Sequence, residues 1–381
     1  MKIRVERDVL AEAVAWTART LPVRPPVPVL AGLLLEVDGH DLTLSSFDYE
    51  VSAQVGVEVT VAEDGRALVS GRLLAEITRS LPAQPVDIAV EGARMTVTCG
   101  SARFTLPTLP VDDYPTLPDM PAASGVVGSD AFAAAVSQVA VAAGRDDTLP
   151  VLTGVRLEID DDTLTLAATD RYRLAARELK WQPDKGGQSA TALVPARTLA
   201  DTARSLTSGA EVTIALNAGG TGEGMIGFEG GGRRTTTRLL EGEFPKYRSL
   251  FPSQYSATAR VATGPFIEAI KRVSLVATRN SSVRLTFSAA GSVVLEAGGG
   301  EDAQASEALD CAFDGDDLTI GFNPSYLLDG LGAIDSDTAQ LGLTTPTKPA
   351  VITGKGAGGE AGDTEAGSDY SYLIMPVRLS S

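Results

Sequence analysis

Hydrophobic and polar residues follow two different periods along this chain. Short stretches such as Lys2 to Val5 alternate between polar and apolar residues, which is typical of half-buried strands. Other stretches place apolar residues three and four positions apart, which predicts amphipathic helices. This second period predicts helices at residues 7–20, 129–145 and 264–279. A second helix of each repeat is expected to begin near Arg72, Arg197 and Pro324, at residues 71–81, 196–206 and 324–334.

The chain also repeats itself on the scale of whole domains. PVLAGLLLEV at residues 28–37 matches PVLTGVRLEI at residues 150–159 without a gap, and Asp48 falls on Asp170 at the same spacing. In a fainter third copy, GFNPSYLLD from Gly321 occupies the slot of LVPARTLAD from Leu193. Repeats this long indicate tandem domains rather than stacked small units. We therefore predict an α+β fold of three similar domains, each with two helices on antiparallel sheet, at residues 1–122, 123–253 and 254–381.

Composition narrows the class of protein. A chain of 381 residues with 44% hydrophobic content can bury a substantial core. Charged residues interrupt the first 21 positions and no later apolar run reaches about 18 residues, so we expect a cytoplasmic protein. Cys99 and Cys311 stand far apart without a nearby second Cys or His, so no metal and no disulfide is expected. We expect no cofactor.

The net charge of −17 argues at first against nucleic acid, because phosphate binding needs Lys and Arg. The charge is unevenly distributed, however: the predicted helices are slightly basic, whereas the rest of the chain is strongly acidic. Arg72 and Arg79 are two helical turns apart, as are Arg197 and Arg204, so each pair projects from one helix face. A solvated face is the ordinary interpretation of one such pair. Its occurrence in two copies favours a surface for DNA phosphates without sequence readout.

Candidate catalytic motifs fail on their context. Residues 222–227 match G-x-G-x-x-G, but the glycine-rich FEGGGRR that follows predicts a hairpin rather than the helix a dinucleotide site needs. His40 and the acidic run 160–162 both fall in predicted turns. A hydrolase or transferase that uses carboxylates in an interdomain groove stays open as an alternative. No nucleophile, base and oxyanion donor come together in the pattern, and we expect no enzyme activity.

Several segments, in order, resemble the bacterial sliding clamp, the beta subunit of DNA polymerase III. They are MKIRVERDVL, RPPVPVL, SGRLLAEITRSLP, FTLPTLPVDDYP, AATDRYRLA, EFPKYRSLFP, GFNPSYLLD and YLIMPVRL. The resemblance runs from the first residue nearly to the last. It implies a homodimeric ring of six domains that encircles duplex DNA, slides on it and tethers the replicative polymerase, the clamp loader, and repair and translesion polymerases. It implies a nucleoid-associated protein without enzyme activity.

The resemblance also carries over residue roles by position. DNA contacts are implied for Arg24, Arg72, Arg79, Arg145, Arg197 and Arg204. Subunit contacts are implied for Arg103, Phe104, Leu106, Leu275 and Val276. A pocket for partner peptides is implied for Leu152, Thr169, Arg171, Tyr172, Arg173, Leu174, Pro245, Leu250, Asn323, Tyr326, Thr347, Pro349, Leu373, Ile374, Met375, Pro376, Val377, Arg378 and Leu379.

The chain departs from the family pattern in the pocket. Arg171-Tyr172 stands where many clamps have Gly-His, Ser249 replaces an arginine of some relatives, and a Gly/Glu-rich loop at 354–369 precedes the tail. These departures leave a second hypothesis, a duplicated clamp whose altered pocket resists an inhibitor or serves a specialised polymerase.

Overall fold

The computed structural model describes residues 1–217, 224–277, 282–298, 303–354 and 369–379. Within them the chain forms six α-helices, at the six places where the sequence predicts them. They are α1 (Arg7–Thr17), α2 (Gly71–Ser80), α3 (Ser129–Ala140), α4 (Ala196–Ser205), α5 (Thr263–Val273) and α6 (Pro324–Gly332). Arg279, at the predicted end of the fifth helix, and most of the loop 354–369 lie outside the described residues.

The third helix is shorter than its predicted range of 129–145. It ends at Ala140, and the chain then turns so that the Gly144 N–H donates to the Leu152 carbonyl at 2.7 Å. A Cβ on Gly144 would lie 3.2 Å from that carbonyl oxygen, so glycine allows the close approach. This turn directs residues 145–149 away from the helix.

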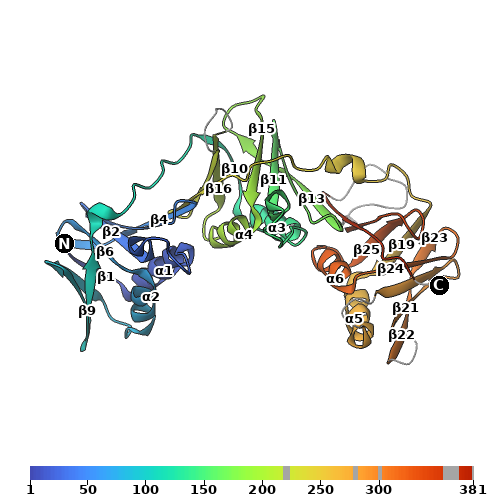
Figure 1. Ribbon diagram of the computed structural model, residues 1–381, viewed down its shortest axis with the longest axis horizontal. Helices are drawn as coiled ribbons and strands as arrows, with labels where there is room; N and C mark the ends of the chain where they lie inside the picture. The colour runs from blue at the N-terminus through green and yellow to red at the C-terminus, as the bar shows by residue number, and fades with distance from the viewer. Residues whose placement is uncertain (218–223, 278–281, 299–302, 355–368, 380–381) are drawn as a thin grey trace. The chain divides into compact units, whose positions relative to one another are not determined.

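By its internal contacts the chain divides into two compact units. Unit 1 comprises residues 1–130, 182–186 and 201–239, and unit 2 comprises 131–181, 187–200 and 240–381. Helices α1 and α2 belong to unit 1 and pack together; α5 and α6 do the same in unit 2 (Figure 1). Helices α3 and α4 each have residues in both units.

Unit 1 is built on one antiparallel sheet of 14 strands among the described residues. The sheet joins strands of the first and second repeats, because β18 pairs with β4, with Thr237 opposite Val51. In spatial order the strands are β14 (Gln182–Pro183), β10 (Ala123–Gly128), β16 (Glu211–Asn217), β17 (Met225–Gly230), β18 (Arg233–Arg238), β4 (Val51–Glu58), β3 (Asp41–Phe47), β2 (Gly32–Asp38), β6 (Gly65–Ser70), β9 (Ala102–Leu109), β8 (Arg94–Cys99), β7 (Val86–Glu91), β1 (Lys2–Val5) and β5 (Thr60–Glu63).

Unit 2 holds two antiparallel sheets in the described part of the chain. The larger runs β15 (Ser189–Pro195), β11 (Gly154–Asp160), β12 (Thr163–Thr169), β13 (Arg173–Lys180), β27 (Tyr370–Ile374), β26 (Ala350–Gly354), β25 (Thr338–Leu343), β19 (Ala257–Ala262) and β23 (Ala312–Asp314). The smaller runs β22 (Gln304–Asp310), β21 (Ser292–Gly298), β20 (Val283–Ser288) and β24 (Leu318–Phe322). The C-terminal strand β27 thus lies beside β13 of the second repeat.

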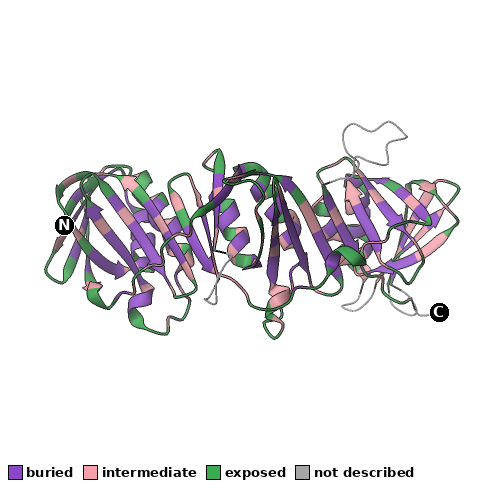
Figure 2. Cartoon of the chain, turned by 90° about the horizontal axis from the view of Figure 1, so that it is seen from above, coloured by how far each residue is buried: buried purple, intermediate pink, exposed green. Residues whose placement is uncertain are grey.

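Much of the length of the strands consists of buried residues, drawn in purple in Figure 2. In unit 1 the helices α1 and α2 cover a core that includes Leu10, Val14, Leu74 and Leu106. In unit 2 the connecting segment after β18 packs Phe244 and Tyr247 onto Leu174 and Leu373. Cys99 and Cys311 are buried free thiols. None of the helices in the described ranges is both long and apolar enough to cross a membrane.

Candidate functional site

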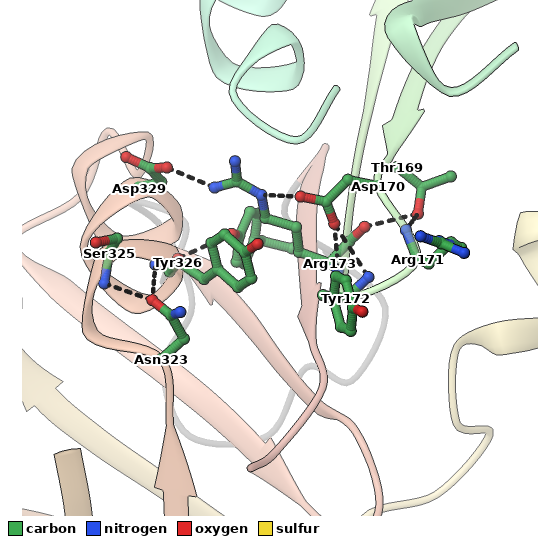
Figure 3. Close-up of polar contacts among 10 residues, drawn as sticks. Thr169, Asp170, Arg171, Tyr172, Arg173, Asn323, Ser325, Tyr326 and Asp329 are labelled. Carbon is green, nitrogen blue, oxygen red and sulfur yellow. Dashed lines mark hydrogen bonds and ion pairs between the residues drawn. The ribbon is translucent and has the colours of Figure 1, made fainter. Parts of the chain in front are cut away.

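The turn between β12 and β13 positions the central residues of the candidate site. Asp170 Oδ1 accepts the backbone N–H groups of Tyr172 and Arg173, at 3.0 and 3.1 Å (Figure 3). Arg171 lies between Asp170 and Tyr172 in the chain. Its backbone φ is 79°, in the left-handed region that normally favours glycine. As a result the side chains of Arg171 and Tyr172 project from the end of the hairpin, and both residues are exposed.

Arg173 is the buried cation beneath this turn, with only 5% of its surface exposed. Its Nε donates to Asp170 at 3.0 Å, and its Nη1 donates to Asp329 of α6 at 2.5 Å. Its guanidinium carbon lies 4.3 Å from the centroid of the Tyr326 ring. Burial disfavours the charged form, but the hydrogen bond to Asp329 and the interactions with Tyr372 and Asp170 together outweigh it and raise the pKa of Arg173. The side chain therefore joins β13 to α6.

Helix α6 is fixed at its first turn. The Asn323 side chain caps it by accepting the N–H groups of Ser325 and Tyr326, at 2.9 and 3.3 Å, and Pro324 takes the first position, where no N–H is needed. The Tyr372 hydroxyl of β27 donates to the Tyr326 carbonyl at 2.8 Å. These contacts hold the Tyr326 ring opposite Tyr172, with 6.3 Å between the ring centroids.

A cavity of about 520 Å³ opens among the turn, the segment before β11 and α6. Its walls combine apolar and aromatic side chains with six charged ones, the mixture expected of a site for a small ligand or peptide. They are Ala143, Gly144, Arg145, Asp146, Leu149, Leu152, Asp170, Arg171, Tyr172, Arg173, Ser325, Tyr326 and Asp329.

Five residues that the resemblance assigns to the partner pocket line this cavity: Leu152, Arg171, Tyr172, Arg173 and Tyr326. The others lie outside its lining. Among them Thr169 donates to the Arg173 carbonyl at 2.6 Å, Asn323 caps α6, and Leu373 and Ile374 are buried in β27. The tail passes beside the turn, because the Met375 N–H donates to the Tyr172 carbonyl at 2.8 Å. Met375 and Leu250 are exposed apolar residues.

Sequence reasoning missed part of the cavity wall. Asp146, Leu149, Ser325 and Asp329 were not among its candidates, and Arg145 was assigned to DNA. The Thr148 hydroxyl and N–H donate to Asp146 and hold the pKa of its carboxyl below the usual value, with a smaller contribution from Arg171. In the sequence, Asp329 aligns with Asp201 of the second repeat, and this alignment was the available signal that Asp329 lies on helix α6. The alignment gave no indication that Asp329 forms an ion pair with Arg173.

The six arginines assigned to DNA are all exposed. Arg72 donates to the Pro22 carbonyl at 3.1 Å and so holds the loop that carries Arg24. Arg204 is paired with Asp201 at 3.2 Å. Arg24, Arg79 and Arg197 make no ion pair within the described residues, which leaves their charge available to a phosphate.

The residues assigned to subunit contacts lie in two places. Arg103 and Phe104 are exposed on β9, which pairs with β6 only at its last two residues and leaves the edge before them open. Leu106 is buried in the core of the same unit, so only its backbone is open to a partner. Leu275, in the short 3-10 helix Ser274–Val276, is 84% exposed.

The described residues of the two rejected motifs, the G-x-G-x-x-G match and the acidic run 160–162, are not arranged as a dinucleotide or metal site. Residues 222 and 223 of the G-x-G-x-x-G match lie outside the described residues, and strand β17 rather than a helix follows them. No group of three or more His, Cys, Asp or Glu side chains in the described ranges is arranged to hold a metal ion.

Family comparisons decide what kind of protein carries this cavity. Residues 1–118, 126–246 and 248–378 match the N-terminal, central and C-terminal domains of the DNA polymerase III beta subunit. The chain belongs to the DNA polymerase III beta subunit family. Its three tandem clamp domains, each combining helices with antiparallel sheet, are the fold that the repeats predicted.

Two relatives from Streptomyces match this chain over its full length. It is 63% identical over 380 residues to the Beta sliding clamp of Streptomyces coelicolor, and 47% identical over 379 residues to the Beta sliding clamp homolog GriR of Streptomyces muensis, with 100% of each chain covered. A crystal structure of a DnaN sliding clamp from Pseudomonas aeruginosa bound to griselimycin is similar with a TM-score of 0.90 and 30% identity, again over 100% of both chains.

Proposed function

We propose that this chain is a processivity factor of DNA polymerase III: two copies close into a ring around duplex DNA and slide on it. The observation that carries the proposal is the match of all three tandem domains to the beta subunit family, with 63% identity over the whole chain to a beta sliding clamp. The protein would act by binding alone, without catalysis, metal or cofactor, at the nucleoid in the cytoplasm.

Ring closure would use two strand edges, one on each copy. The open edge of β9 carries Arg103 and the exposed Phe104, while β22 is an edge strand that carries the acidic Asp310, beside Glu307, which is paired with Arg272. Leu275 is an exposed apolar residue in the same unit as β22. Unpaired strand edges bind other strands readily, and opposite charges favour this pairing. A head-to-tail contact of this kind closes when the rotation completes a full turn.

The exposed arginines on α2 and α4 would face the DNA phosphates. A strongly acidic chain repels DNA overall, so a few cations on the inner helices hold the duplex weakly and without sequence readout. Weak contact suits a protein that must move along DNA. Its persistence on DNA would come from the closed ring.

The cavity on unit 2 would bind short peptide segments of the partners, namely the replicative polymerase, the clamp loader, and repair and translesion polymerases. Its apolar walls and few polar groups suit such a segment. Deletion of residues 375–379 tests this role, because the Met375 N–H is bonded to the turn that lines the cavity. We expect loss of polymerase binding and an intact dimer. Dissociation of the dimer would contradict the assignment.

The ring itself is tested by topology. The full-length protein is loaded onto nicked circular DNA with its clamp loader, and the circle is then linearised. We expect retention on the circle and release from the linear form, because a ring slides off a free end. Retention on linear DNA would indicate simple adhesion and overturn the ring.

A second candidate function is a duplicated clamp whose altered pocket resists an inhibitor. The 47% identity to the homolog GriR and the Arg171-Tyr172 pair in the cavity wall favour it. Griselimycin is the probe, because a solved clamp binds it. Tight binding at the cavity supports the main replication clamp, whereas failure to bind in a protein that still loads on DNA supports the resistant copy.

A further inference from the structure

A second cavity, of about 320 Å³, lies within unit 1. Its lining comes from strands β2, β4, β6 and β18 and from residues 114–119 of the segment that leads from the first repeat to the second. This volume is at the lower end of the range for ligand pockets. It suits one long side chain better than a large cofactor.

The four charged side chains of this lining are unequally engaged. Arg66 Nε is paired with Glu36 Oε1 at 2.8 Å. Arg234 is paired at 3.2 Å with Glu229, which lies outside the lining. Within the described residues, Oε2 of Glu36 and the exposed carboxylate of Asp119 have no hydrogen-bond or ion-pair partner. The cavity therefore offers free carboxylate oxygens, whereas both of its cations are already paired.

The second repeat shows what the same glutamate binds when its surroundings are complete. By the alignment of the repeats, Glu158 is the counterpart of Glu36. Its Oε1 accepts a hydrogen bond from Arg156 Nε at 2.6 Å. Its Oε2 accepts from the Tyr247 hydroxyl at 2.9 Å and from Arg248 Nη2 at 2.8 Å. In unit 2 the chain itself thus supplies donors to both oxygens.

The segments that follow the two repeats pack on their sheets in the same way. YPTLP from Tyr114 aligns with FPKYR from Phe244. Tyr114 belongs to a buried cluster with Leu68, and Phe244 belongs to one with Leu193, the counterpart of Leu68 in the second repeat. Because packing and alignment agree, they establish which positions of the two segments correspond.

By this correspondence, Leu117 and Pro118 stand where unit 2 has Tyr247 and Arg248. The side chains of Leu117 and Pro118 have no hydrogen-bond donor, and both residues line the cavity. The cavity of unit 1 is therefore the place that a phenol and a guanidinium fill in unit 2. Glu36 keeps one oxygen without a donor for the same reason.

We propose that this cavity binds an arginine side chain from a peptide segment of a partner protein, with Glu36 and Asp119 as its anchors. A guanidinium suits the place because its planar fork can donate to the free oxygen of Glu36 while the other oxygen stays with Arg66. A peptide is the expected source, because the chain's own occupant of the matching place is the dipeptide Tyr247-Arg248. The site is independent of the cavity on unit 2.

The probe is the fluorescein-labelled tetrapeptide amide Lys-Tyr-Arg-Ser, which copies residues 246–249. Its twin carries citrulline, an uncharged analogue of arginine. Fluorescence anisotropy with the full-length protein gives the ratio of the citrulline to the arginine dissociation constant. We expect the arginine peptide to bind about three- to fivefold tighter, the range of a partly exposed ion pair. The ratio should fall as salt is raised.

Three variants separate this site from the general attraction of an acidic chain for a cationic peptide. Glu36→Gln should bring the ratio to about one. Glu58→Gln is the matched control, because it removes the same charge from β4 outside the lining, and it should leave the ratio unchanged. Pro118→Arg supplies an arginine within the chain, as Arg248 does in unit 2, and should also bring the ratio to about one while Glu36 is intact.

Each other outcome counts against the site. Equal binding of the twin peptides, binding of neither, or an equal loss of the ratio in Glu36→Gln and Glu58→Gln overturns it. Displacement of the labelled peptide by argininamide at the same concentration as by the unlabelled peptide would indicate a free guanidinium compound and overturn the partner segment. The proposed ring is judged separately, by release from linearised DNA.

Discussion

Arg173 lies against the face of Tyr326, with its guanidinium carbon 4.3 Å from the ring centroid, and so connects strand β13 to helix α6. The two residues are far apart in the sequence, and the ion pair of Arg173 with Asp329 strengthens the connection. Water has little access to the Arg173 side of the pair, because Arg173 is buried, whereas Asp329 is 42% exposed.

Replacing Arg173 with Met should loosen α6 strongly. The change leaves the largely buried Asp170 without its cation, and breaking a buried pair from one side costs about 3 kcal/mol. Asp329→Asn should cost less than about 1 kcal/mol, because Asp329 is 42% exposed. Hydrogen exchange of the α6 amides measures the local opening without assuming one global transition. Equal losses in both variants would contradict the dominant role of Arg173.

Gly330→Ala should destabilise the contact between α6 and β27. The new Cβ would lie 2.4 Å from two ring carbons of Tyr372, a fully buried side chain. Overpacking of this kind costs about 1–3 kcal/mol. Gly332→Ala on the same helix is the matched control: its Cβ meets nothing within 4 Å, so alanine should be neutral or stabilising. Thermal unfolding compares the two, and a stable Gly330→Ala variant would disprove the close packing.

Glu158 should make the stability of unit 2 depend on acid pH. Burial opposes its charge, but hydrogen bonds from Arg248, Tyr247 and Arg156 outweigh burial and hold the pKa of Glu158 below its usual value. A lowered folded-state pKa gives stability that is present above the unfolded value of about 4.3 and is lost as pH falls through the folded value.

Glu158→Gln should therefore lower the midpoint of thermal unfolding near neutral pH, and the difference from the original chain should shrink below about pH 4. Calorimetry at several pH values measures it. Glu178→Gln is the control, because its carboxylate is 56% exposed and 3.7 Å from Arg248. A difference that persists unchanged in acid would rule out the charged network as its cause.

Charge reversal of Arg79 or Arg197 should weaken loading onto circular DNA, since both are exposed and free of ion pairs in the described residues. Each lost phosphate contact should reduce the slope of log affinity against log salt by about 0.9. Arg72 is a less clean choice because it also holds Pro22. Lys180→Glu, at a hairpin where Lys180 pairs with Asp162, is the control. An equal effect of this control would point to overall charge rather than to a defined DNA surface.

Leu275→Glu should convert the dimer to monomers. An 84% exposed leucine is expected to be covered in the assembly, and burying a carboxylate there without a partner is costly. Sedimentation velocity gives the oligomeric state. Val23→Glu is the matched control, because Val23 is 80% exposed and lies outside the proposed contact. If both variants stay dimeric, the contact lies elsewhere.

The sequence by itself determined the elements and their repetition. The first helix of each repeat followed from apolar spacing, because the side chains on one face of a helix are encoded within a few residues of each other. The second helices were predicted near Arg72, Arg197 and Pro324, where α2, α4 and α6 lie. The tandem fold and its family followed from segments repeated along one chain. Boundaries were less exact: the third helix ends at Ala140 because Gly144 turns toward Leu152, a contact that local spacing does not encode.

Only the tertiary structure decided how the cavity is built. It brought Arg145 and Asp146 beside Arg171, buried Leu106, and joined Arg173 to Asp329 across 156 positions of sequence. The reason is physical: periodicity describes neighbours along one helix or strand. The surroundings of a charge, and so whether it is engaged or free, depend on which distant elements pack against it.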